Sequence, residues 1–307
     1  MTLLCTLILV FFSERLFWTV FLPGDSLGDQ LMTILAYMAP TYLFIAMTKY
    51  FNAHNFSRVF FCGIVFGWLV EGGLTHTMYG TQDSAPFPLS ILCTSVSWHA
   101  LISATLGWYF IPKFLQSGKE KELKKLSIGL GIFWGVWAMF LWQETPAIVA
   151  SIPEFTIQAF FITALLTGSY RLLKSKKIHE FKPGKTGLFL SIVLLGIFFS
   201  EHVKNLGARP IYILFPLIAA VFILLKITQR HETIGEKEVN KKNLKYLFYM
   251  PLAASITYTL MTVLNFGWVP IAKIVFYWVT VPLGIILLIF AAYQLFRKSN
   301  NLPATGP

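Results

Sequence analysis

The sequence predicts an all-α fold, a polytopic integral membrane helical bundle of about ten transmembrane helices. Of its 307 residues, 56% are hydrophobic and only 13% are charged, whereas a soluble domain carries about a quarter charged residues. Apolar runs of about 20 residues, the length that a helix needs to cross a bilayer, recur along the chain. The runs are continuously apolar, so they lack the alternation of a transmembrane β-barrel.

The whole chain, residues 1–307, is expected to form one transmembrane domain, because no stretch has the composition of a soluble domain. The N-terminal segment is apolar from Leu3 and has no Lys or Arg before Arg15, unlike a cleaved signal peptide, so we expect it to remain as a helix. The ten spans are expected at residues 2–21, 31–50, 59–75, 89–111, 126–144, 155–173, 186–203, 210–228, 244–264 and 270–296.

Basic residues gather in alternate short loops. Of the 25 Lys and Arg residues, 21 lie in or beside segments 51–58, 112–125, 171–185 and 226–245 or in the tail at 297–298. With ten spans, all of these segments fall on one side of the membrane, which the positive-inside rule assigns to the cytoplasm. Both termini are therefore expected to be cytoplasmic, with the cell membrane as the location.

The formal net charge of +11 is thus explained by topology, and nucleic acid is not an expected partner. Basic loops at a cytoplasmic surface suit anionic headgroups, so membrane lipids are the expected partners. Cys5, Cys62 and Cys93 fall inside apolar runs, without disulfide or metal-type spacing. No nucleotide-binding loop, nucleophile elbow or HExxH motif is present.

The ionisable residues of most interest lie on two expected helices between residues 59 and 111. Glu71, His76 and His99 fall in or beside hydrocarbon, where ionisable side chains are costly and usually functional. At about 1.5 Å per residue, Glu71 lies about 18 Å from the inner edge and His99 about 15 Å from the outer edge of a core about 30 Å thick. Glu14 reaches the depth of Glu71 on the first helix, so three groups are expected at one level.

Two glycines follow Glu71 directly and weaken the helix at that point. In a regular helix His76 points away from Glu71, but unwinding at the glycines would let His76 turn back over the carboxylate. Glu71, His76 and His99 would then form a metal site or a proton-transfer site. The alternative is a polar helix end at which His76 is simply wet.

His99 lies on a polar helix face. Ser95, His99 and Ser103 are spaced four residues apart and so line one side of the fourth expected helix. That side should face the bundle interior or a wet cavity and not lipid. The alternative to a functional role is a structural histidine that hydrogen-bonds between helices.

Arg15 gives the main competing explanation of Glu71. Glu14 and Arg15 are adjacent and cannot share a helix face, so their partners must lie on different helices, or Arg15 must snorkel to water. Arg15 is expected to pair with a carboxylate, first Glu71 and second Glu144. An Arg15–Glu71 pair would make Glu71 a structural partner and not a ligand.

Further polar residues end or line other expected helices. Glu201 and His202 close the seventh span and are weaker metal-ligand candidates, because charges at helix ends are common at the headgroup level. Ser255 and Thr259 share a face of the ninth span. Their hydroxyls could line a substrate pathway or hydrogen-bond neighbouring helices.

Two classes of function remain. One is an intramembrane enzyme acting on a lipid or isoprenoid-like substrate, with Glu71, His99 and Glu14 as acid and base groups and a divalent metal as a candidate cofactor. The other is a proton-coupled secondary transporter of a small molecule that uses the same residues, with Arg15, Ser95 and Ser103, as a pathway. A structural membrane protein with internally paired charges is the third alternative. The mixture of carboxylates and histidines at one depth favours the enzyme.

Overall fold

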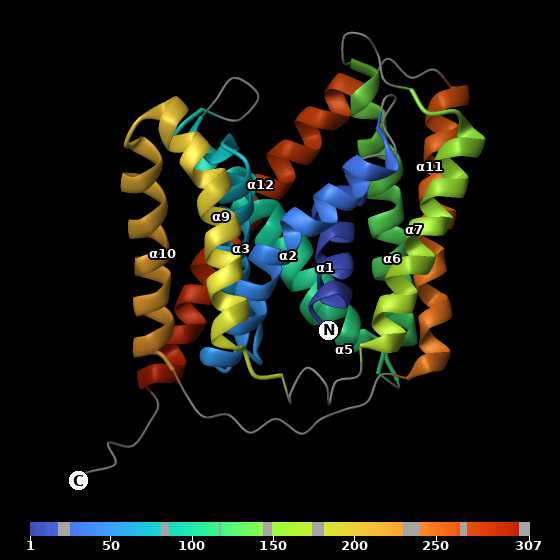
Figure 1. Cartoon of the computed structure of the whole chain (residues 1–307). Coiled ribbons are helices and arrows are strands. Elements are labelled where there is room, and N and C mark those ends of the chain that lie inside the picture. Colours follow the sequence, from blue (N-terminus) through green and yellow to red (C-terminus); the bar gives the residue numbers. More distant parts are fainter. Residues whose placement is uncertain are drawn as a thin grey trace. The chain divides into compact units, whose positions relative to one another are not determined.

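The structure, a computed structural model, describes residues 1–17, 25–80, 86–116, 118–143, 149–173, 181–229, 240–264 and 269–300. Within these ranges the chain is helical and contains no strand, which confirms the all-α prediction for the described part (Figure 1). The helices are α1 Thr2–Val10, η1 Phe11–Arg15, α2 Leu27–Tyr50, α3 Phe56–Trp68, η2 Leu69–Leu74, η3 Thr77–Tyr79, α4 Ser90–Cys93, η4 Ser95–Phe110, α5 Ile111–Phe114, α6 Glu120–Trp137, η5 Ala138–Gln143, α7 Ile152–Leu172, α9 Lys185–Leu206, α10 Arg209–Ile227, η6 Lys241–Phe248, α11 Tyr249–Val263 and α12 Val269–Asn300.

Eight helical stretches in the described part are long and apolar enough to cross a membrane. Each coincides with a predicted span, so a multi-pass helical membrane protein is supported by both sequence and structure. The stretches are Leu27–Tyr50, Phe56–Leu74, Ser90–Phe114, Glu120–Phe140, Lys185–Leu206, Arg209–Ile227, Lys241–Val263 and Trp278–Arg297.

The other two predicted spans are not among these eight stretches. The span at residues 2–21 is helical from Thr2 to Arg15, and its last residues lie outside the described part. The span at 155–173 forms helix α7 but is not among the eight stretches. The count of ten and the cytoplasmic position of both termini therefore remain predictions.

The chain packs into two compact units. Unit one comprises Met1–Leu35, Leu106–Phe181 and Glu236–Val279, and unit two comprises Ala36–Thr105, Lys182–Gly235 and Thr280–Pro307. The expected single transmembrane domain over residues 1–307 remains a prediction.

Unit one is built on the close pair of helices α6 and α11, with α7 beside α11 (Figure 1). A β-carbon at Gly135 would lie 2.5 Å from the Ala254 carbonyl oxygen, so the two backbones touch there. The rings of Phe155 and Tyr258 stack at 4.2 Å between centroids. Small residues that let helix backbones approach in this way are typical of helix pairs in membranes.

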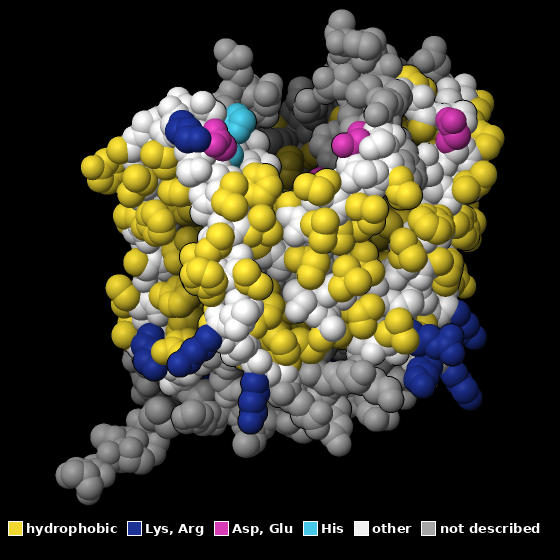
Figure 2. Space-filling view, in the orientation of Figure 1, with side chains coloured by type: hydrophobic (Ala, Val, Ile, Leu, Met, Phe, Trp, Pro, Cys, Tyr) yellow, Lys and Arg dark blue, Asp and Glu magenta, His cyan; other side chains and the backbone are white. Residues whose placement is uncertain are grey.

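Unit two contains the helices that position the site. Asn55 caps the start of α3 by accepting a hydrogen bond from the Arg58 backbone nitrogen at 3.1 Å. Helix α9 packs against η2, which continues α3, and α10 packs against both α3 and α9. On the outer face of α9, Phe189, Ile192 and Ile197 are exposed. Figure 2 shows this hydrophobic covering along the middle of the helices, as expected for a surface in contact with lipid.

Candidate functional site

Glu71 is placed by two glycines that precede it at four-residue intervals. Gly63 and Gly67 bring α3 against η4: a β-carbon at Gly63 would lie 2.5 Å from the Ala104 Cβ, and one at Gly67 would lie 2.6 Å from the Ser95 carbonyl oxygen. Because residues four apart share a helix face, Glu71 continues this contact face toward η4. The close approach of the two backbones therefore presents Glu71 to the side chain of His99.

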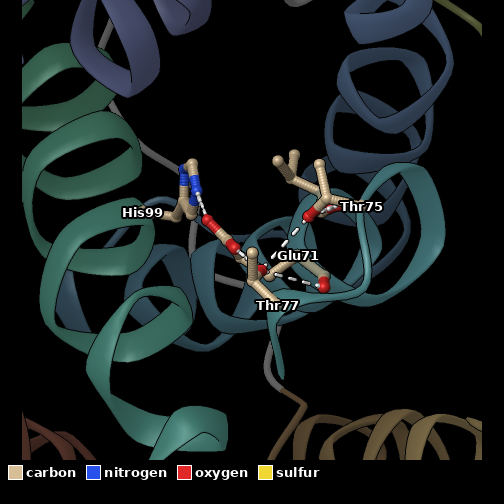
Figure 3. A network of polar contacts seen from close by, with 5 residues as sticks. Glu71, Thr75, Thr77 and His99 are labelled. Carbon is tan, nitrogen blue, oxygen red and sulfur yellow. Dashed lines mark hydrogen bonds and ion pairs between the residues drawn. The ribbon is translucent and has the colours of Figure 1, made fainter. Parts of the chain in front are cut away.

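Glu71 and His99 form a direct contact. The His99 Nε2 atom lies 2.7 Å from the Glu71 Oε1 atom (Figure 3). The His99 side chain is only 4% exposed and the Glu71 side chain 13%. The predicted proximity of these two residues is thus found in unit two. A buried carboxylate hydrogen-bonded to one ring nitrogen fixes the orientation of the imidazole.

Thr77 holds the other oxygen of the carboxylate. Helix η2 ends at Leu74, directly after the two glycines, and Thr75 is extended. The chain then turns back, and the Thr77 hydroxyl donates to Glu71 Oε2. The Thr75 and Thr77 hydroxyl oxygens lie 3.2 Å apart. Thr75, Thr77, Glu71 and His99 therefore form a chain of polar contacts that runs from the exposed Thr75 to the buried imidazole (Figure 3).

The loop that carries Thr77 is itself anchored. The Tyr79 hydroxyl donates to the Gly72 carbonyl at 2.7 Å, and the Ser90 hydroxyl donates to the Met78 carbonyl at 2.7 Å. Burial raises the pKa of the Tyr79 phenol, so it remains a donor at neutral pH. A β-carbon at Gly72 would come within 2.0 Å of the Met78 sulfur, so a larger residue there would have to displace the Met78 side chain. The loop is thus locked onto the end of η2.

Aromatic rings support the other side of the pair. The His99 ring meets the Phe66 ring edge-on at 5.8 Å between centroids. Phe66 in turn contacts Phe44 at 5.7 Å and Tyr37 at 6.3 Å, both on α2. This packing holds the imidazole in place within an apolar surrounding, in which electrostatic interactions are stronger than in water.

The ionisable residues expected deep in the spans all lie in π-helical segments. Glu14 and Arg15 belong to η1, Glu71 to η2 and His99 to η4. The wider π turn is rare and occurs frequently at functional sites. It also replaces the regular α-helix that we expected around His99.

Ser95 and Ser103 are buried together with His99, as the polar face of this helix predicts. The Ser95 hydroxyl has no hydrogen-bond partner among the described residues. Ser255 and Thr259 lie on α11 in unit one. A role of these hydroxyls in a substrate pathway remains a prediction.

Glu14 and Arg15 also lie in unit one, and Arg15 is 8% exposed. The pairing of Arg15 with Glu71 and the common depth of Glu14, Glu71 and His99 remain predictions. Glu144 lies outside the described residues.

His76 lies against His202, and Thr77 is the loop residue that binds the Glu71 carboxylate. The His76 ring lies 5.6 Å from the His202 ring between centroids, and Glu201 is paired with Lys204 at 2.6 Å. Among the described residues, no three His, Cys, Asp or Glu side chains converge as metal ligands. The expected set of His76, His99 and Glu71 is therefore not assembled, and metal binding remains a prediction.

The sequence reasoning missed Gly63, Gly67 and Thr77. The two glycines did carry a signal, since small residues four apart in an apolar segment are typical of a close helix contact. Thr77 carried none, because its position depends on how the loop folds back.

No family model matches the chain, and no curated protein or solved structure matches it.

Proposed function

We propose that the chain is a membrane-embedded enzyme that transfers a proton to or from an apolar substrate, with His99 as the acid–base group. The observation that carries this proposal is the buried contact of 2.7 Å between His99 Nε2 and Glu71 Oε1. A carboxylate that orients an imidazole is a recurring arrangement for general acid–base catalysis.

Glu71 is suited to position the His99 ring, because its own carboxylate is fixed. One carboxylate oxygen meets His99 and the other accepts from Thr77, so the carboxylate is held at both ends. Its negative charge would stabilise the imidazolium that forms when His99 takes a proton.

The apolar surroundings of the pair support a lipid or isoprenoid-like substrate. Phe66 and His99 lie within two spans whose residues are mostly apolar. A lipid or isoprenoid-like molecule can enter such a site from the bilayer. We propose no ligand set for a divalent metal at the Glu71–His99 pair.

A proton-coupled transporter is the second candidate, and the polar chain from Thr75 through Thr77 to Glu71 favours it. Hydroxyl groups can accept one hydrogen bond and donate another, so the chain could carry protons between His99 and the exposed loop. Transport would also require a path from His99 to the opposite side of the membrane.

The test uses the full chain in liposomes that contain a polar lipid extract and isoprenoid alcohols, incubated in D2O. We expect mass spectrometry to reveal a lipid that gains deuterium or is converted, with the reaction lost in His99→Gln. Unchanged lipids, together with proton uptake in pH-gradient liposomes that depends on His99, would favour the transporter instead.

A further inference from the structure

A second histidine pair lies at the end of the span that carries Glu71. His76 is exposed in the loop after η2, and His202 lies near the end of α9, which packs against η2. Their ring centroids are 5.6 Å apart, with the ring planes inclined by 52°. The two residues are far apart in the sequence, so the contact is made by the fold of unit two.

His202 has an unsatisfied ring nitrogen. The residue is only 7% exposed, and its Nε2 atom has no hydrogen-bond partner among the described residues. Buried polar atoms are nearly always paired, and an exception calls for a partner such as water or an ion. A neutral imidazole whose Nε2 carries no hydrogen presents a lone pair there, the form that binds a metal.

The spacing of the rings fits a shared ion. With Zn–N bonds of about 2.0–2.1 Å and tetrahedral angles, two imidazoles on one Zn²⁺ have centroids roughly 5–6 Å apart. We propose that His76 and His202 bind a divalent transition-metal ion such as Zn²⁺ as a two-histidine site. Imidazole nitrogen suits zinc, copper and nickel.

The remaining coordination positions would be taken by water, because His76 is exposed. Among the described residues no third His, Cys, Asp or Glu joins the pair. An open site of this kind binds metal reversibly. The ion would tie the loop to α9 and so hold Thr77, the next residue after His76, on Glu71. This site is separate from the Glu71–His99 pair and does not rest on the function proposed for it.

Binding is tested with Zn²⁺ alone on the full chain, purified in detergent through a tag that contains no histidine. Equilibrium dialysis followed by elemental analysis measures the bound zinc. We expect the wild type to bind one equivalent of zinc. The affinity of His76→Gln for zinc should be lower by a factor of about ten or more. His76 is exposed, so this variant should fold. His54→Gln, in the loop before α3, is the matched control and should bind as the wild type does.

A second measurement identifies the ligands. Cu²⁺ bound in place of Zn²⁺ should give an electron paramagnetic resonance spectrum with coupling to two imidazole nitrogens, and His202→Gln should reduce it to one. Zinc uptake by His76→Gln equal to that of the wild type, or no uptake by the wild type, would overturn the assignment.

Discussion

The backbone of Ser95 lies directly against Gly67, and a β-carbon at position 67 would come within 2.6 Å of the Ser95 carbonyl oxygen. One helical turn further on from Gly67, Glu71 meets His99 at 2.7 Å. The two contacts depend on each other, because the glycine sets the separation of the helices from which the acidic and basic side chains project.

Gly67→Ala should destabilise the protein. The added methyl group meets backbone atoms of Ser95, which cannot rotate away, and overpacking of this kind costs about 1–3 kcal/mol. Thermal melting in detergent measures the effect. Gly196→Ala on α9 is the control, because no atom lies within 4 Å of a β-carbon there. Equal melting temperatures for the two variants would contradict the close helix contact.

Thr77→Val should destabilise the end of η2, whereas Thr77→Ser should not. Valine keeps the shape of threonine but removes the hydroxyl that donates to Glu71 Oε2, and loss of a hydrogen bond to a largely buried carboxylate costs about 1–3 kcal/mol. Serine keeps the hydroxyl. We expect Thr77→Ser to melt near the wild-type temperature and Thr77→Val to melt below both. A Val variant as stable as the Ser variant would remove Thr77 from the site.

Single cysteines at Lys121 and Lys182 should label from the same side of the membrane, the cytoplasmic side. Both residues are exposed, Lys121 in the first turn of α6 and Lys182 after α7, so they share a side only if α7 spans the bilayer. The native Cys5, Cys62 and Cys93 are buried and should give little background. Labelling of Lys121→Cys from outside, or of the two positions from opposite sides, would overturn the ten-span topology.

Much of the fold could be predicted because a membrane-spanning helix is recognisable from its local sequence alone. A continuous apolar run needs no tertiary information, so eight predicted spans coincide with helices that are long and apolar enough to cross a membrane. The glycines after Glu71 predict a weakened helix, but neither they nor the residues around His99 indicate a π turn in particular.

The candidate site was predictable in part for the same reason. Glu71 and His99 stand out as ionisable residues in apolar runs, and short loops bring successive helices together. Which residue folds back over Glu71 depends on the loop, where Tyr79 and Ser90 fix the chain so that Thr77 and not His76 reaches the carboxylate. The partner of His76 is His202, on a helix distant in the sequence, and no local pattern links them.

The stability of Glu71→Gln and His99→Gln tests the central claim most directly. Glutamine keeps the size and polarity of each side chain but removes the charge or the basicity. Groups kept for chemistry carry a stability cost in a low-dielectric surrounding, so both variants should melt in detergent at or above the wild-type temperature while losing proton transfer. A drop in melting temperature for both variants, corresponding to about 3–5 kcal/mol for a broken buried ion pair, would contradict the claim and make the pair a structural contact between helices.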